Sequence, residues 1–428
     1  MIRILILILL LTWPAAGEDL QAIRCGRLLD VRTGRLLEGQ VIVVRGDRIQ
    51  SVGRQAPASA RVIDLSDHTV LPGLIDVHTH LIDDDPANYS LTRPLTTSEA
   101  QMAFGSIPNA WATVQAGFTS VRDLGTYRAF VDVALRDAIE RGSVIGPRIQ
   151  PCGAYITVSQ GAGALTGLAP DVELPLSLRF GQCDGPDQVR QRVREVIRRG
   201  AGVVKILATG AVLTKGSTPG AQDMTFEEMA AAVDEARRSG LKVACHAHGA
   251  AGARDAIRAG VASIEHGSLL DEEALRMMKE RGVFLSADLY NNEYVLENPP
   301  KGYPQEYLDK MRATREAQNR VFQRARQLGV RIAFGSDSAT IPHGTNARQF
   351  ALYVRLGMPP DEAIRTATVT AADLLGWSDR VGAVEPGKLA DLIAVRGNPL
   401  EDIRLLESPA FVMKGGEVLR NDAGETNR

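Results

Sequence analysis

Between residues 71 and 375, eight short apolar runs alternate with stretches of helical periodicity, and this alternation limits the possible folds more than any other feature. The clearest helical stretches are 187–197, 226–240 and 359–376. Such alternation predicts an α/β fold, a (β/α)8 TIM-like barrel, with its active site at the carboxyl ends of the strands. The alternative, an open doubly wound sheet, lacks support because no Gly-x-Gly-x-x-Gly turn follows an early strand. The predicted strands cover residues 74–78, 118–123, 147–154, 202–207, 242–247, 262–266, 283–288 and 331–336.

Both ends of the chain differ from this middle region. Residues 23–70 contain short strand-like runs separated by turns, and similar runs return at 391–395 and 411–418. Strand-rich ends that enclose a helical middle predict one small β-sandwich domain assembled from both termini. The predicted organisation is a small domain from residues 18–70 and 376–428, with the barrel at 71–375.

The first 17 residues have the composition of a secretory signal. Arg3 precedes an almost continuous aliphatic stretch from Ile4 to Trp13, and small residues follow before the acidic Glu18. This pattern predicts that residues 1–17 are removed and that the protein is exported, either periplasmic or secreted. The stretch is too short to span a bilayer comfortably, so no stable membrane span is expected after removal. A buried first strand or an uncleaved anchor is the alternative interpretation.

Charge and cysteine content restrict partners and cross-links. The net charge is −2 and basic residues form no long block, so no nucleic-acid partner is expected. Cysteines of an exported chain can be oxidised. Cys152 and Cys183 flank the third and fourth predicted strands and are candidates for a disulfide, although the sequence does not fix the connectivity.

Histidines gather where the predicted strands end. His78 and His80 close the first strand, and residues two apart on a strand point to the same face, so both imidazoles can reach one metal ion. Six of the seven histidines, all but His68, lie just past a predicted strand or in the loop after one. This placement predicts a metal site rather than isolated structural histidines. The further candidate ligands at strand ends are His246, His266 and Asp337.

Lys205 is unusual because it lies inside the apolar run 202–207. A buried lysine is costly unless its charge is lost or paired. A neutral amine near metal ions can react with carbon dioxide, and the resulting carbamate has two oxygens that can bridge two metals. The alternative is a buried ammonium paired with Asp123 or Glu265.

Together these segments resemble the amidohydrolase superfamily. The segments "LPGLIDVHTHL", "VVKI", "CHAHG", "IEHG", "FGSDS" and "VGAVEPGKLADLIAV" occur in family order and are similar to its binuclear-metal branch. Within it, the chain most resembles the imidazolonepropionase-related group, which includes Xaa-Pro dipeptidases, carboxypeptidases acting on N-acyl amino acids, and ochratoxin-degrading amidases. The segments "ADLYNNEYV" and "HGTNARQF" add to this likeness.

The resemblance implies a ligand set for two divalent metals. Zinc suits a histidine-rich site with carboxylate oxygens, and manganese or cobalt can substitute. By position, one metal is held by His78, His80 and Asp337, the other by His246 and His266, and carboxylated Lys205 bridges both together with a hydroxide. At the fifth strand the choice between His246 and His248 stays open; His246 is preferred because it directly ends the strand.

The resemblance also implies a reaction. Two metals activate a shared water and polarise the scissile carbonyl, and Asp337 acts as general base and then general acid. His248 is predicted to orient or polarise the substrate, and Tyr290 to hydrogen-bond it or simply to pack; His343 is a further candidate. The expected substrates are small molecules, Xaa-Pro dipeptides or N-acyl amino acids, with ochratoxin A as a further candidate. A homo-oligomer is also implied.

Other functions remain open at this point. A cyclic-amide or lactone hydrolase, or a deaminase, would use the same barrel, and a non-catalytic binding protein is a third interpretation. Two departures from the family pattern bear on the substrate. In the stretch 159–164, which includes Ala162, an alanine stands where many relatives have a histidine after the third strand, and Gln349 replaces a frequent glutamate.

Overall fold

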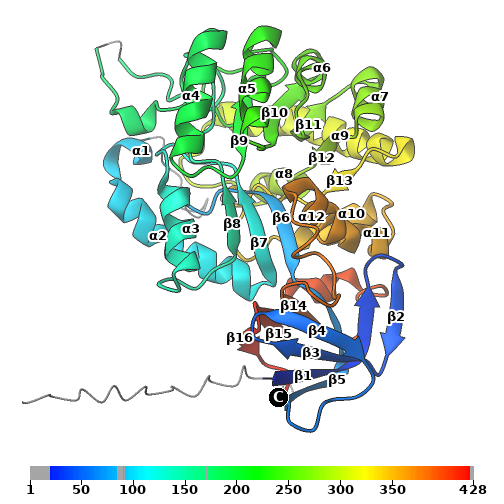
Figure 1. The fold of residues 1–428 in the computed structure, drawn as a ribbon. Helices are drawn as coiled ribbons and strands as arrows, with labels where there is room; N and C mark the ends of the chain where they lie inside the picture. Colours follow the sequence, from blue (N-terminus) through cyan, green and yellow to red (C-terminus); the bar gives the residue numbers. More distant parts are fainter. Residues whose placement is uncertain (1–19, 84–89, 91, 170, 425–428) are drawn as a thin grey trace, which may run out of the picture.

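The computed structural model describes residues 20–83, 90, 92–169 and 171–424 of this α/β protein (Figure 1). The predicted signal at residues 1–17 therefore lies outside the described residues. Among the described residues, no helix has the length and apolar character needed to cross a membrane.

Strands from both chain ends form one eight-stranded mixed sheet, which lies below the parallel strands in Figure 1 and is called the terminal sheet here. The hydrogen-bonded order is β16-β15-β14-β5-β1-β3-β4, with β2 paired to β1. Strands β1 and β5 are parallel, and the other pairs are antiparallel. Its strands are β1 (Leu20–Asp30), β2 (Arg35–Glu38), β3 (Val41–Arg45), β4 (Arg48–Gly53), β5 (Arg61–Pro72), β14 (Leu392–Arg396), β15 (Phe411–Lys414) and β16 (Glu417–Asn421).

The terminal sheet has a hydrophobic core of its own. Ile23 in β1, Val44 in β3 and Val70 in β5 are fully buried and pack with Phe411 of β15. The predicted joining of the two chain ends in one β unit agrees with this sheet. Because hydrogen bonds connect the strands into a single continuous sheet, a two-layered sandwich stays a prediction.

All eight apolar runs of the middle region form strands, and each pairs in parallel with its neighbours. They belong to a three-stranded sheet, β6-β7-β8, and a five-stranded sheet, β13-β12-β11-β10-β9. Between the two sheets, the described residues show single bridges, Thr79 to Ser338 and Ile156 to Ile206, rather than continuous ladders. The strands are β6 (Leu74–Thr79), β7 (Phe118–Asp123), β8 (Arg148–Pro151), β9 (Val204–Leu207), β10 (Val243–Gly249), β11 (Ser263–Leu269), β12 (Phe284–Ser286) and β13 (Ile332–Ala333).

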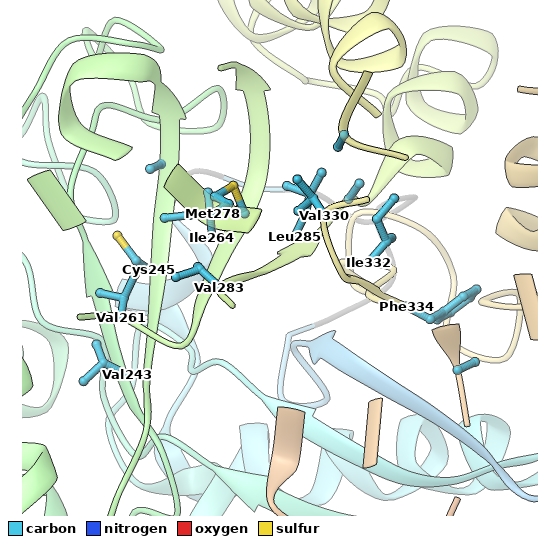
Figure 2. Close-up of a cluster of buried hydrophobic side chains, with 14 of the residues drawn as sticks. Val243, Cys245, Val261, Ile264, Met278, Val283, Leu285, Val330, Ile332 and Phe334 are labelled. Carbon is cyan, nitrogen blue, oxygen red and sulfur yellow. The ribbon is translucent and has the colours of Figure 1, made fainter. Parts of the chain in front are cut away.

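Alternation along the parallel strands separates core from site. Figure 2 shows Cys245, Ile264 and Leu285 in the core cluster beside Met278 of helix α7. Successive side chains on a strand point to opposite faces. His246 in β10 and Glu265 in β11, which directly follow Cys245 and Ile264, therefore project away from this cluster and toward the enclosed side of the strands.

Helices connect and cover the parallel strands (Figure 1). The predicted helical stretches at 187–197 and 226–240 are confirmed as α4 and α5. The helices are α1 (Arg93–Thr96), α2 (Glu99–Gln115), α3 (Val131–Glu140), α4 (Pro186–Arg198), α5 (Phe226–Arg238), α6 (Ala250–Ala259), α7 (Glu272–Arg281), α8 (Leu289–Glu297), α9 (Gln305–Leu328), α10 (Arg348–Arg355), α11 (Pro360–Thr366) and α12 (Val369–Leu375).

The single helix predicted at 359–376 is wrong, because two helices, α11 and α12, occupy this stretch. Between the two helices, backbone carbonyls accept hydrogen bonds from amides of the parallel-strand region. Phe334 N–H donates to Thr366 O (3.0 Å) and Ile75 N–H donates to Ala367 O (2.8 Å). Thr368 adopts φ −130° and ψ −103°, outside the helical range. The helix is interrupted where its carbonyls bond to the backbone amides of Ile75 in β6 and of Phe334 directly after β13.

The suggested disulfide between Cys152 and Cys183 is also wrong. All four cysteines are free and buried. Cys152 packs with Leu124 and Val203, whereas Cys183 belongs to a different hydrophobic cluster and donates from Sγ to Gly181 O (3.6 Å). Each thiol therefore behaves as a small apolar core residue.

Candidate active site

The candidate ligands predicted from the sequence meet around one cavity of about 280 Å³ at the carboxyl ends of the parallel strands. One group of potential ligand atoms comes from His78, His80 and Asp337, and these atoms lie within 4.8 Å of one another. The Asp337 Oδ1 atom is 3.1 Å from His80 Nε2 and 3.5 Å from His78 Nε2. The residues of the sequence-predicted set that line the cavity are His78, His80, Lys205, His246, His248, His266 and Asp337.

The remaining histidines pack ring against ring beside this group. The ring centroid of His266 is 4.6 Å from that of His246, 5.0 Å from that of His248 and 4.9 Å from that of His78. Asp337 also belongs to a second group of potential ligands, with His266 and Asp288. Asp337 therefore belongs to both groups of potential ligand atoms.

Buried partners orient these imidazoles. His78 Nδ1–H donates to Glu265 Oε2 (3.0 Å), His80 Nδ1–H donates to Gly125 O (2.5 Å), and His266 Nδ1–H donates to Asp288 Oδ2 (2.9 Å). Each contact uses Nδ1, so Nε2 is the nitrogen on the opposite side of the ring, where those of His78 and His80 lie near Asp337. A partner on the far nitrogen is the usual arrangement around metal-binding histidines.

The two histidines of β10 present different nitrogens. His246 Nε2–H donates to Gly210 O (3.3 Å), which leaves Nδ1, whereas His248 Nδ1 is 2.9 Å from Ser268 Oγ, which leaves Nε2. Both side chains line the cavity. The choice of ligand at this strand therefore stays a prediction in favour of His246.

Lys205 is only 2% exposed and lines the cavity. Burial lowers the pKa of its amine, and the charge of Glu265 opposes that shift. The alternative of an ion pair is not seen within the described residues. The Asp123 carboxylate accepts from the backbone amides of Leu81 and Gly125, and Glu265 binds His78 and Arg122 instead.

Burial and neighbouring charges also shift the pKa values of the other candidate site residues. Burial, together with the charge of Lys205, lowers the pKa of His78 to about 3, and burial with neighbouring charges holds those of His246 and His248 well below the usual range. These imidazoles are neutral, which is the form that binds metals. For His80, burial is outweighed by Asp337, and the pKa rises to about 9. The histidines in turn keep the pKa of the Asp337 carboxyl well below its usual range, although burial acts in the opposite direction.

Two candidate ligands occupy unusual backbone conformations. His266 has φ 67° and Asp337 has φ 55°, a left-handed region that residues other than glycine rarely adopt. Asp337 is held there by its backbone amide, which donates to His78 O (2.8 Å). Such strain is typical of functional positions. Clustered imidazoles, a carboxylate and a desolvated amine fit a divalent metal centre of zinc type.

Two further predicted site residues lie outside this cavity. Tyr290 is the second residue of α8, and its hydroxyl accepts from Arg348 Nη1 (3.4 Å) while its ring packs against the core. His343 Nε2–H donates to Asp83 O (3.2 Å). The tyrosines that line the cavity are Tyr127, Tyr155 and Tyr303.

Several residues at the site were missed by sequence reasoning. Asp288 lies two residues past the end of β12, the same kind of position that identified Asp337, so this signal was present in the sequence. Its carboxylate also accepts from Asn291 Nδ2 (2.5 Å) and Gln318 Nε2 (3.0 Å). Arg122 gave no signal, because its contact with Glu265 (2.7 Å) joins two strands that are far apart in sequence.

The two departures from the family pattern differ in importance. Ala162 and Gly163 line the cavity, so the missing histidine leaves a small residue in the wall. Gln349 is buried in α10, where its amide donates to Gly335 O (2.8 Å) and Tyr353 Oη (3.2 Å). Gln349 therefore supports the end of β13 rather than the cavity surface.

A model of the amidohydrolase family matches residues 69–419. The chain belongs to this family. It is 33% identical over 409 residues to ochratoxinase from Aspergillus niger, an alignment that covers 90% of this chain and 84% of that protein.

Two solved amidohydrolase structures show the same fold. A Xaa-Pro dipeptidase with bound methionine in the active site is 36% identical, with a TM-score of 0.89, over 94% of this chain and 100% of that one. A prolidase complexed with N-methylphosphonate-L-proline is 30% identical, with a TM-score of 0.88, over 94% and 100% of the two chains. These findings confirm the predicted family group and show an amidohydrolase that acts on amide bonds. The alternative of a non-catalytic binding protein is therefore set aside.

Proposed function

We propose that this amidohydrolase is a binuclear metal-dependent enzyme that cleaves Xaa-Pro dipeptides or N-acyl amino acids. The observation that carries the proposal is the convergence of four histidines, Lys205 and Asp337 on one buried cavity. The relatives support the substrate class, because one is a Xaa-Pro dipeptidase with methionine in its active site and another is an ochratoxinase.

His78, His80 and Asp337 would hold one metal, His246 and His266 the other, and Lys205 as a carbamate would bridge them. When bound, the two ions, for which zinc is the best fit, supply an activated water and polarise the scissile carbonyl. Asp337 Oδ1 or Oδ2 accepts the proton of the attacking water and returns it to the leaving amine nitrogen. His248, whose Nε2 is not engaged by Ser268, orients the substrate carbonyl.

The carbamate at Lys205 is supported by a desolvated amine that has no carboxylate partner within the described residues. Lys205→Ala is expected to lose most of the bound metal, which elemental analysis of purified protein measures. Retention of two ions per chain would contradict the bridge. Because the alanine leaves a cavity, the melting temperature of the variant must be measured alongside.

The organisation of the chain is part of the proposal. The eight parallel strands are proposed to close into one (β/α)8 barrel over residues 71–375, and the bridges from Thr79 to Ser338 and from Ile156 to Ile206 support this. Residues 18–70 and 376–428 would form the small β domain, and residues 1–17 a signal for export. A homo-oligomer is proposed from the family resemblance alone.

The decisive experiment is hydrolysis by zinc-loaded protein of a panel of Xaa-Pro dipeptides, N-acyl amino acids and ochratoxin A. Metal content is determined on the same sample. Cleavage with two metals per chain is the expected result, and the profile ranks the substrates. Two metals without cleavage would contradict the substrate class and direct the search to cyclic amides, lactones and esters.

A further inference from the structure

Asp83 is a third carboxylate in the wall of the cavity, beside Asp288 and Asp337. Asp288 and Asp337 are both engaged with candidate ligand histidines. The Asp83 carboxylate instead accepts a hydrogen bond from Thr126 Oγ1 (2.6 Å). The charges of His80 and Arg93 act on it, but among the described residues neither forms an ion pair with it within 4.0 Å. A carboxylate in such a setting gains from a cation that arrives with the ligand.

The position of Asp83 is fixed from several sides. Its backbone amide donates to His80 O (3.1 Å), which closes a tight turn directly after the candidate ligands His78 and His80. Its carbonyl accepts from Asn109 Nδ2 of α2 (3.1 Å) and from His343 Nε2 (3.2 Å). Together with the contact to Thr126, these bonds hold the carboxylate ready before any ligand binds.

Two tyrosines, together with His80 and Arg93, line the cavity near this carboxylate. Tyr127 and Tyr155 line the cavity and lie close enough for the charge of Asp83 to affect their hydroxyls. Aromatic faces and a fixed carboxylate together form a favourable environment for a substituted ammonium group. The cavity therefore offers a cation subsite next to the candidate ligands.

We propose that Asp83 binds a protonated amine of the substrate, the free N-terminal ammonium of an unblocked dipeptide. The inference rests on the proposed function and narrows it. The α-amine of a dipeptide is two bonds from the scissile carbonyl carbon, so its subsite must lie beside the metal centre, and Asp83 is three residues after His80. Acylation of the amine removes the charge, so Asp83 selects unblocked dipeptides over N-acyl amino acids.

The test compares L-methionyl-L-proline with its N-acetyl derivative as substrates of wild-type protein and Asp83→Asn. Wild type is expected to prefer the unblocked peptide. The asparagine keeps the shape and the Thr126 contact but removes the charge, so kcat/KM for the unblocked peptide should fall about tenfold to a hundredfold. The rate for the acetylated peptide should hardly change. An unchanged ratio in Asp83→Asn, or no preference in wild type, would overturn the proposal.

Asp309→Asn is the matched control, because it removes the same charge from an exposed position on α9. It should leave both rates and their ratio at wild-type values. A second pair, Nα-acetyl-lysyl-proline and Nα-acetyl-norleucyl-proline, identifies the source of the ammonium. A loss in Asp83→Asn confined to the lysyl peptide would place a side-chain amine at Asp83 and overturn the N-terminal assignment.

A binding measurement separates failure of this inference from failure of the proposed function. If neither peptide is hydrolysed, metal-loaded protein is titrated calorimetrically with L-methioninamide and with its neutral N-acetyl form. Tighter binding of the cation that is lost in Asp83→Asn would support the subsite without the hydrolysis. Equal binding of the two amides, or binding of neither, would reject it.

Discussion

The candidate ligand histidines each use one ring nitrogen for a partner within the protein. Glu265, the carbonyl of Gly125 and Asp288 hold His78, His80 and His266 in this way. Glu265 is itself fixed by Arg122 (2.7 Å) and by the hydroxyl of Ser263. The geometry of the site thus depends on buried charges one layer behind the ligands.

Glu265→Gln tests this layer. The amide can still approach His78, but it no longer balances Arg122 or fixes the imidazole tautomer. Metal affinity is expected to fall about tenfold to a hundredfold, measured by competition with a chromophoric chelator. Glu297→Gln, an exposed substitution at the end of α8, is the control and should bind metal normally. Wild-type metal affinity in Glu265→Gln would show that the charge of Glu265 behind His78 does not contribute to metal binding.

Asp337→Asn tests proton transfer. The variant is expected to fold with an unchanged melting temperature but to lose about 10²- to 10⁴-fold in kcat, the usual contribution of a general acid–base. Metal content measured on the same preparation separates the two roles of this side chain. Inactivity with both metals retained assigns proton transfer, whereas near-normal turnover would remove Asp337 from that role.

The clustering of candidate site residues could be predicted where each residue stands at the end of an apolar run. His78, His246 and Asp337 each follow an apolar run, and the structure brings them to one cavity. Glu265 appeared in the sequence only as a possible partner of Lys205, because its contact with His78 spans 187 residues and depends on strand register. Tyr290 was misplaced relative to the cavity because the chain turns into α8 directly at Leu289.

At the level of elements, the meeting of β6 and β13 decides where the ligands lie. Gly335 follows β13, and a methyl group on its Cα would lie 2.1 Å from Ser286 Oγ and 2.8 Å from His78 Cβ. The close approach lets the next turn carry Asp337 against His78 and His80. A glycine is required here for contact distance rather than for backbone conformation.

Gly335→Ala is therefore expected to separate β13 from β6. The free energy of unfolding should fall by about 1–3 kcal/mol, as for other overpacked cores, and metal binding should weaken with it. Chemical denaturation and metal titration measure the two effects. Gly53→Ala in the terminal sheet is the control, since a methyl group there meets no atom within 4 Å. Equal stability of the two variants would contradict the argument.

Elements were predicted well wherever local pattern decides them. The eight strands and helices α4 and α5 follow from apolar runs and helical periodicity. The interruption between α11 and α12 could not be predicted from the sequence. It depends on hydrogen bonds from the backbone amides of Ile75 and Phe334, which contact this segment only in the folded protein. Tertiary hydrogen bonds of this kind override local helix propensity.

At the scale of the whole molecule, polar contacts join the terminal sheet to the parallel strands. Arg148 of β8 pairs with Asp391 (3.0 Å), whose backbone carbonyl accepts from Gly73 N (2.9 Å). Lys414 of β15 donates from Nζ to Gly146 O (2.6 Å). The segment before β6 and the segment before β14 are thereby fixed to each other.

Lys414 makes this junction sensitive to pH. Burial, assisted by the charge of Arg148, lowers the pKa of Lys414 from 10.5 to about 8. Between these values the unfolded chain holds a proton that the folded protein has lost, so the contribution of Lys414 to stability rises with pH. Wild type should gain stability relative to Lys414→Met from about pH 8 to about pH 10.5, by less than about 1.4 kcal/mol per pH unit because the side chain is partly exposed.

Urea denaturation across this pH range measures the difference. The control is Lys301→Met, a change at an exposed position outside the junction, whose difference from wild type should not vary with pH in the same way. A constant difference between wild type and Lys414→Met across the range would show that Lys414 keeps its proton in the folded protein.

The terminal sheet also sets the order in which the molecule is completed during synthesis. Pro72 of β5 pairs with Leu392 of β14, so the ribosome must make every residue between them before this pairing can form. After β5, the parallel strands and their helices are all made before β14, and until then one edge of β5 stays unpaired. A nascent chain therefore carries an open strand edge through most of its translation, the kind of edge that chaperones shield from neighbouring chains.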